Sequence, residues 1–221
     1  VWSDNFYTNV AGDLYNEMIP GRIPGNDEAT IRTVVNKILG YERHPYLADS
    51  LWFRRGTTIV REDGDADDSI YWYDAHTAAR LMVRDGYVTV DTFSYFQGDD
   101  AADVIQAINR GRSLVLFRGQ STCMWWSPFY VDPSSTSNGY KLPIVVSPTC
   151  EQVDPSHGSC GERWVKAGTP TDPKGGVGFC GPSTSLMGGA YLRSAEAQGF
   201  LRGLFRSDSL YTLGRACEAA R

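Results

Sequence analysis

SLVLF at residues 113–117 and LPIVV at residues 142–146 are the two stretches that decide the fold class of this 221-residue chain. Both are almost continuously apolar. Such runs are typical of parallel strands whose two faces are both buried, because a strand with one solvated face would alternate apolar with polar residues. Polar residues follow each run, RGQS at 118–121 and SPTCE at 147–151. Ligands of open α/β sheets bind beyond the carboxyl ends of the strands, so we expect the functional groups at these two places.

Strands and helices alternate along the rest of the chain. The clearest helix has apolar residues at positions i, i+3, i+4 and i+7, beginning at Ile31, and runs from a cap at residues 26–27 to about residue 42. This alternation predicts an α/β fold with an open, mostly parallel sheet and helices on both faces. The other expected strands cover residues 51–60, 87–93 and 176–180, and the other expected helices lie near residues 70–82, 99–108, 159–167 and 186–205.

Composition excludes several classes of protein. An apolar content of 42% with a net charge of only −5 excludes a disordered chain. A pI near 5.2 without a Lys/Arg-rich run argues against nucleic acid as a partner. No stretch approaches the roughly 18 consecutive apolar residues of a membrane span. The five cysteines include no CxxC pair, so a zinc site is not expected. We also expect no required cofactor.

The two strand ends also carry a family resemblance, together with IPGRIPGND at residues 19–27 and KILGYERHP at residues 37–45. The chain resembles the gingipain-type cysteine peptidases of family C25, clan CD, over nearly its whole length. Members of that family carry a GRI or GRF segment, a helix ending in YER, a strand ending in Tyr-x-Gly-His-Gly and a strand ending in the nucleophilic Cys. Their order is kept here by Gly21-Arg22-Ile23, Tyr41-Glu42-Arg43, Phe117-Arg118-Gly119-Gln120-Ser121 and Cys150, followed by Cys160-Gly161-Glu162 and the strand at 176–180.

The resemblance implies a three-layer, caspase-like fold for residues 1–221. It also implies that this catalytic subdomain is a fragment of a longer precursor, with the family's preceding subdomain missing. The first residue, Val1, is not Met and no signal peptide is present, which fits that expectation. Since family members are exported, we expect an extracytoplasmic location, secreted or at the cell surface.

The resemblance places the nucleophile at Cys150 and the general base at position 120, which is Gln. A carboxamide does not titrate in the working range, so Gln120 cannot shuttle a proton or stabilise a thiolate as an imidazolium would. Ser121 replaces the Gly that follows the family His, and with Gly119 it would border the substrate cleft. We therefore predict a catalytically impaired pseudopeptidase that acts in binding, assembly or scaffolding, with a peptide, a protein or other segments of its own precursor as partner.

Two alternatives to this prediction stay open. His157, in a loop beyond Cys150, is a candidate substitute base, and with it the chain would be an active cysteine endopeptidase. In the second alternative the chain is a purely structural subunit whose former cleft is closed by aromatic residues or by a disulfide from Cys150 to Cys123 or Cys160.

Further candidates lie on the loops around the expected cleft. Asp63, with Glu62 adjacent, is the nearest match to the family's third catalytic carboxylate. Asp63, Asp65 and Asp67 also have the i, i+2, i+4 spacing of oxygen ligands in a calcium loop, and family members often bind structural calcium. Trp125 and Trp126 follow the first strand end. They predict either an aromatic platform for a peptide or a seal over the end of the sheet.

Overall fold

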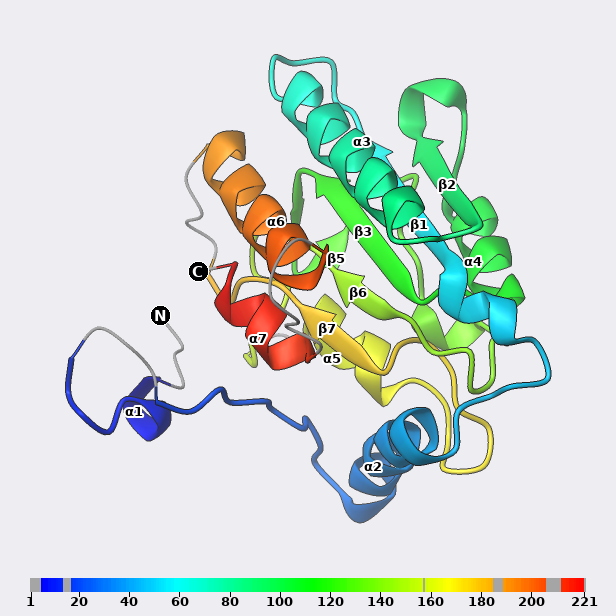
Figure 1. Cartoon of the computed structure of the whole chain (residues 1–221), viewed down its shortest axis with the longest axis vertical. Coiled ribbons are helices and arrows are strands. Elements are labelled where there is room, and N and C mark those ends of the chain that lie inside the picture. The colour runs from blue at the N-terminus through cyan, green and yellow to red at the C-terminus, as the bar shows by residue number, and fades with distance from the viewer. Residues whose placement is uncertain (1–4, 14–16, 157, 185–188, 206–211, 221) are drawn as a thin grey trace.

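A computed structural model describes residues 5–13, 17–156, 158–184, 189–205 and 212–220. Its centre is a five-stranded sheet of strand order β2-β1-β3-β6-β7 (Figure 1). Every pair of neighbouring strands in this sheet is parallel, which confirms the predicted α/β class and sheet type. The strands are β1 (Arg55–Arg61), β2 (Thr89–Ser94), β3 (Leu114–Gly119), β6 (Ile144–Val146) and β7 (Gly178–Cys180).

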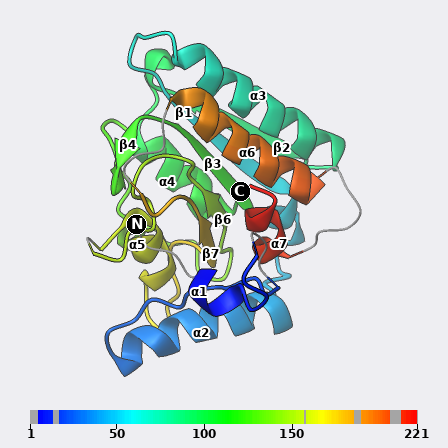
Figure 2. The same cartoon turned by 90° about the vertical axis from the view of Figure 1, so that its left-hand side faces the viewer.

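Helices cover both faces of the sheet, and β3 shows how its sequence produces that layering. Leu114 and Leu116 pack in one core cluster with α3 (Asp68–Arg84) and α6 (Ala190–Phe205). Val115 and Phe117 point to the other side. They pack in a second cluster with α4 (Ala101–Arg110) and α5 (Cys160–Lys166), so the sheet lies between the two pairs of helices (Figure 2). A strand buried on both faces has no solvated positions, which explains the unbroken apolar run.

The predicted first helix is α2 (Glu28–Arg43), and it lies outside this sandwich against α5. Asp27 caps it, accepting the Thr30 amide at 2.8 Å. Short elements complete the described chain: α1 (Asn5–Thr8), η1 (Ser50–Arg54), η2 (Tyr95–Gln97), β4 (Ser121–Thr122), β5 (Met124–Trp125), η3 (Pro133–Ser135) and α7 (Leu213–Glu218).

One predicted strand is wrong over its first half. Residues 51–54 belong to the 3-10 helix η1, and β1 begins only at Arg55. The rings of Trp52 and Phe53 stack with centroids 4.0 Å apart, whereas neighbouring side chains of an extended strand point to opposite faces. Trp52 is fully buried and its indole N–H donates to the Tyr46 carbonyl at 2.9 Å. The predicted start of the last long helix at residue 186 lies outside the described residues, and α6 is described from Ala190.

A buried lysine joins α2 to the rest of the molecule. Lys37 is 1% exposed, and its Nζ lies 2.6–3.3 Å from the carbonyl oxygens of Trp164, Val165, Ala167 and Lys174. Burial lowers the pKa of Lys37 to about 7, and the four carbonyl acceptors oppose that shift because they favour the protonated amine. The ammonium thus bonds the carbonyls of Trp164 and Val165, which lie in the last turn of α5 and lack donors within the helix.

Candidate functional site

The candidate site lies where β3 and its neighbour β6 end. Gln120 follows the last residue of β3, and Cys150 is reached from β6 through residues 147–149. The two segments meet, because Thr122 and Cys150 form an isolated parallel bridge. The Thr149 hydroxyl also donates to the Ser121 carbonyl at 3.2 Å. The structure therefore brings the segment that carries Gln120 and Ser121 beside Cys150.

Gly119 is required by the close approach of β1 and β3. Its φ is +154°, and a Cβ at this position would stand 2.8 Å from both the Cβ and the carbonyl oxygen of Arg61, its register partner. A side chain would thus separate the strands or bend the chain before Gln120. This glycine supports the geometry of the strand end independently of any contact with a substrate.

A chain of buried hydrogen bonds supports the turn that carries Cys150 on its core side. The Trp125 indole donates to Ser147 Oγ at 2.9 Å, and that hydroxyl donates to Gln152 Oε1 at 2.9 Å. Gln152 Nε2 in turn donates to the carbonyl of Cys150 at 3.1 Å and lies 3.4 Å from Ser121 Oγ. Gln152 is fully buried. One amide side chain, which sequence reasoning did not single out, therefore joins the Cys150 backbone to the Ser121 side chain on the other side of the site.

The two adjacent tryptophans have different roles. Trp125 is 1% exposed and stacks on Phe117 with ring centroids 4.7 Å apart, so of the two alternatives it takes the seal over the end of the sheet rather than the platform. It belongs to the core because β5 turns its ring toward the sheet, where Trp164 also lies 5.6 Å away. Trp126 points the other way and is 41% exposed, with the Arg61 guanidinium 5.4 Å from its ring centroid. Only Trp126 can serve as a platform.

Two residues beside the nucleophile position have strained backbones. Among the described residues, Cys123 and Glu151 are the non-glycine residues with positive φ, at 46° and 56°. The Cys123 thiol donates to Glu151 Oε2 at 3.1 Å, so the pair joins the segments that follow β3 and β6. Burial, reinforced by Glu151, raises the pKa of Cys123 to about 11, which keeps this thiol protonated. Strain of this kind costs about 1–3 kcal/mol per residue and is common at functional sites.

No disulfide joins any of the five cysteines, all of which lie among the described residues, so none closes the site. Cys160, one of the two partners considered for Cys150, is fully buried in the core with Trp164 and Val145. Burial raises the pKa of Cys160 to about 12. Here it behaves as a small apolar side chain.

A buried ion pair lies beneath the site. Arg118, on β3, and Asp74, on α3, are both 0% exposed, and Arg118 Nε lies 2.7 Å from Asp74 Oδ2. Arg118 Nη1 also donates to the Pro148 carbonyl at 2.9 Å, two residues before Cys150. Asp74 Oδ1 accepts further bonds, at 2.7 Å each, from Ser194 and Gln198 of α6. The pair thus connects the Cys150 turn to α3 and α6.

Glu196 should make the stability of this region depend on pH. Its Oε2 is buried without a hydrogen-bond partner among the described residues, and burial raises the pKa of Glu196 to about 7 despite the opposing charge of Arg118. Because its pKa is higher in the folded than in the unfolded state, stability should fall as pH rises from about 4.5 to about 7. We expect Glu196→Gln to remove this fall and to stabilise the protein at pH 8 by on the order of 2 kcal/mol.

Urea unfolding of the wild type and Glu196→Gln at pH 5 and pH 8 measures this effect. Glu28→Gln is a matched control, since Glu28 is 76% exposed on α2. A wild-type and a Glu196→Gln protein with equal stability at both pH values would refute the prediction.

Comparison with known proteins assigns this arrangement to a family. The family model for peptidase family C25 matches residues 1–221. The chain belongs to peptidase family C25.

Two solved structures with the same fold illustrate this assignment. A gingipain R, the Arg-specific cysteine proteinase RgpB, has a TM-score of 0.83 at 19% identity, over 99% of this chain and 52% of that one. A complex of Porphyromonas gingivalis RgpB pro- and mature domains has a TM-score of 0.81 at 18% identity, over 100% of this chain and 54% of that one.

Curated relatives agree with this assignment. Gingipain R2 of Porphyromonas gingivalis is 25% identical over 182 residues, which cover 76% of this chain and 24% of the relative. Gingipain R1 of the same species is 25% identical over 182 residues, which cover 76% of this chain and 18% of the relative. The C25 chain therefore spans about a quarter or less of these curated relatives and about half of the similar solved structures. No described helix is both long and apolar enough to cross a membrane.

Two adjacent carboxylates follow β1 in this C25 chain, and the structure distinguishes them. Glu62 is 1% exposed and accepts hydrogen bonds from the Trp72 indole at 3.0 Å, the Ser94 hydroxyl at 2.6 Å and the Tyr95 amide at 3.0 Å. The Asp63 side chain is 24% exposed, with Arg61 Nη1 3.7 Å away. Its assignment as a third catalytic carboxylate stays a prediction. Glu62 is the carboxylate that its surroundings orient, and sequence reasoning placed it second.

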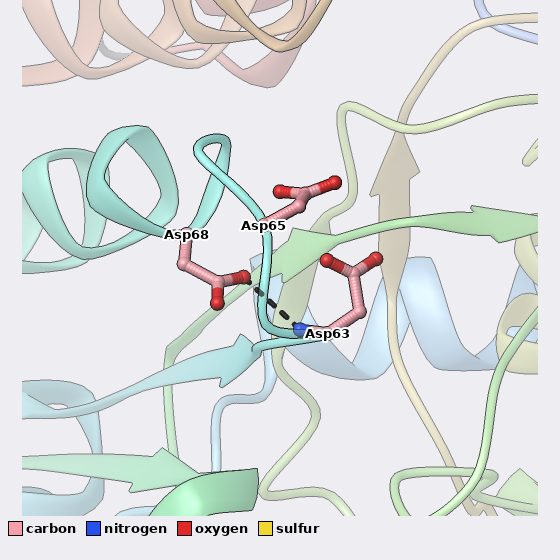
Figure 3. A group of neighbouring side chains, drawn as sticks. All are labelled: Asp63, Asp65 and Asp68. Carbon is pink, nitrogen blue, oxygen red and sulfur yellow. Dashed lines mark hydrogen bonds between the residues drawn. The ribbon is translucent and has the colours of Figure 1, made fainter.

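The acidic loop before α3 gathers Asp63, Asp65 and Asp68, whose oxygens lie within 4.8 Å of one another (Figure 3). The expected third member, Asp67, instead has its carboxylate 3.9 Å from Arg193, whereas Asp68 accepts the backbone amides of Asp63 and Gly64 at 3.0 Å each. Burial, followed by repulsion from Asp65 and Asp68, raises the pKa of Asp63. These oxygens are the donors that Ca²⁺ prefers, and a cation would relieve the repulsion. Calcium binding here stays a prediction.

The two histidines that the structure describes, His44 and His76, lie on a helix or at its end and not at the strand end that carries Gln120. His44 is the exposed C-cap residue of α2, on the helix that lies outside the sandwich. His76 is exposed on α3, where its ring lies 5.0 Å from that of Trp72. Neither stands in the place of Gln120. His157, the predicted substitute base, lies outside the described residues.

Proposed function

We propose that this chain is a gingipain-type pseudopeptidase domain that binds a peptide at the Cys150 edge of the sheet without cleaving it efficiently. The observation that carries the proposal is the bridge between Thr122 and Cys150, which sets the Gln120 segment beside the family's nucleophile position. A thiolate attack needs a base that takes the thiol proton and later returns it to the leaving amine. Gln120 has no proton that it can exchange in this way.

Retained structure at this edge supports a binding role. Gly119 still allows the close approach of β1 and β3, and Gln152 still ties the Cys150 carbonyl to the opposite segment. Trp126 offers an exposed ring beside Arg61. Rigid aromatic side chains of this kind contribute strongly to peptide binding.

The proposed partner is a peptide segment, either from another protein or from the chain's own precursor. A structural neighbour was solved as a complex of its pro- and mature domains, so a pro-segment is one source of such a peptide. Because another neighbour is described as Arg-specific, an arginine-containing peptide is the appropriate probe. An extracytoplasmic location, as in gingipain-type proteins, is part of the same proposal.

Fluorescence anisotropy of a labelled peptide with a central arginine tests binding, and chromatography of the same mixture tests cleavage. We expect binding without cleavage, and a loss of affinity of about tenfold or more in Trp126→Ala, because a large ring at the centre of a binding surface is worth about 1–3 kcal/mol. Tyr46→Ala is the matched control, since Tyr46 is 41% exposed, as Trp126 is, and lies before η1 at the opposite end of β1.

Cleavage that disappears in Cys150→Ala would contradict the pseudopeptidase proposal. Loss of that cleavage in His157→Ala as well would establish the active endopeptidase alternative. Equal affinity of the wild type and Trp126→Ala for the peptide would refute the proposed binding surface, whatever the outcome for cleavage.

A further inference from the structure

A polar hollow lies at the amino-terminal edge of the sheet, opposite the Cys150 edge. It encloses about 450 Å³ where β1 and β2 begin and α4 ends. This volume lies within the range of about 300–1,000 Å³ that is typical of small-molecule sites. The wall is strongly polar, and its residues come from four separate parts of the chain: Asp49, Arg55, Thr89, Asp91, Arg110 and Arg112.

Arg112 is the most buried charged side chain of this hollow, and hydrogen bonds hold its guanidinium in place. Its side chain is 4% exposed and pairs with the carboxylate of Asp91. Arg112 Nε donates to Thr57 Oγ1 at 3.0 Å, and Nη1 donates to the Gly111 carbonyl at 2.8 Å. The guanidinium is therefore held in one orientation by strands β1 and β2. A preorganised cation of this kind costs little entropy when a ligand binds.

Arg55 forms a second ordered side. Its Nη1 and Nη2 lie 2.7 and 3.4 Å from the two carboxylate oxygens of Asp49. Nη1 also donates to the Arg110 carbonyl at 3.1 Å, so the end of α4 is attached to the beginning of β1. The position of Arg110 relative to Arg55 is thus set by a direct bond.

Positive charge exceeds negative charge around the hollow. Arg110 donates to the neutral Gln106 Oε1 at 2.9 Å, and within the described ranges no carboxylate lies at ion-pair distance from it. Lys141, whose Nζ donates to the Asn109 carbonyl at 2.7 Å, lies nearby: burial lowers the pKa of Lys141, Asp49 opposes that shift, and Arg55 and Arg112 add to it. Three arginines thus line the hollow with two carboxylates, a local charge of 3 − 2 = +1 in a chain of net charge −5.

We propose that this hollow binds a small phosphate-type oxyanion, either inorganic phosphate or the phosphate group of a monoester. Planar guanidinium groups match the geometry of phosphate oxygens and can bind them in a bidentate manner. Thr89 adds a hydroxyl-bearing residue to the wall. The scarcity of apolar residues disfavours an apolar ligand, because such ligands need hydrophobic walls. The proposal is independent of whether the Cys150 edge cleaves or binds peptides.

Isothermal titration of the full chain with inorganic phosphate, and separately with phenyl phosphate, tests the proposal, with sodium chloride at matched ionic strength as reference. We expect saturable binding of phosphate and none of chloride. Arg110→Gln should weaken phosphate binding at least about tenfold, because it removes a charge-assisted contact without disturbing a buried pair. Arg80→Gln is the matched control, an exposed arginine on α3 bonded to Thr77.

A second variant should change affinity in the opposite direction. Asp91→Asn removes the counter-charge of Arg112, so we expect tighter phosphate binding than in the wild type. Tighter binding of phenyl phosphate than of phosphate would identify a monoester as the preferred source, and the reverse would identify the free anion. Equal heats in phosphate and chloride, or undiminished affinity in Arg110→Gln, would overturn the proposal. Melting curves of each variant without ligand confirm that it is folded.

Discussion

Gln120→His, combined with Ser121→Gly, is expected to create Cys150-dependent peptide cleavage at a rate about 10²–10⁴ times that of the wild type. This range is the usual contribution of a general acid-base group. The variant would place an imidazole directly after Gly119, on the segment that the Thr122 bridge sets beside Cys150. The glycine at 121 restores the small residue that the family has after its His. Hydrolysis of a fluorogenic peptide with arginine before the cleaved bond measures the rate.

Three comparisons decide whether a gain has the proposed cause. Gln120→Asn with Ser121→Gly is the matched control, because it changes the same positions without adding a titratable group. Adding Cys150→Ala to the histidine variant should return the rate to that of the wild type. Ser121→Gly alone should have little effect. A histidine variant that folds, as judged by its melting curve, and yet gains no activity would show that more than the base is missing from this site.

Arg118→Met is expected to lower the free energy of unfolding by about 3–5 kcal/mol, the usual cost of removing one partner of a buried ion pair. The Asp74 carboxylate would remain 0% exposed without its counter-ion, and the Pro148 carbonyl would lose its donor. Urea unfolding measures the change. Because Arg118 holds the turn before Cys150, we also expect the alkylation rate of Cys150 by iodoacetamide to change in Arg118→Met, measured well below the unfolding transition.

A surface ion pair offers the matched control for this prediction. Arg32 and Glu28 of α2 lie 2.6 Å apart with side chains that are 68% and 76% exposed, so Arg32→Met should cost less than about 0.5 kcal/mol. In the double variant Arg118→Met with Asp74→Leu, part of the stability should return, because no buried charge is left unpaired. Arg118→Met as stable as Arg32→Met would show that the buried pair is not what holds these elements together.

Much of the fold followed from local patterns. The apolar run that became β3 is buried on both faces in the structure, as such a run predicts, and the residues after it lie at the candidate site. The spacing that begins at Ile31 predicted α2 to within about two residues at each end. These patterns succeeded because the period of a helix or strand is determined by neighbours in sequence. The 3-10 turn at η1 escaped prediction, since Trp52 and Phe53 resemble strand residues and only their stacking on each other reveals the turn.

The site was predicted less completely than the fold. Position 120, Cys150 and Gly119 came from the order of motifs, which a sequence contains in full. The buried amide of Gln152 and the orientation of Glu62 could not be found in this way, because Gln and Glu beyond a strand end are ordinarily solvated. Their burial depends on donors from other elements, such as Ser147 for Gln152 and Trp72 for Glu62.

The amino-acid sequence by itself therefore determined the α/β class, the C25 family and the absence of an imidazole at position 120. The tertiary structure decided which of two neighbouring residues is used: Trp125 enters the core while Trp126 faces solvent, and Asp68 rather than Asp67 joins the acidic cluster. It also decided that Arg118 meets Asp74, 44 positions away, beneath the Cys150 turn. The physical reason is that backbone periodicity and motif order are local properties, whereas burial and charge pairing depend on which distant side chains the packed layers bring together.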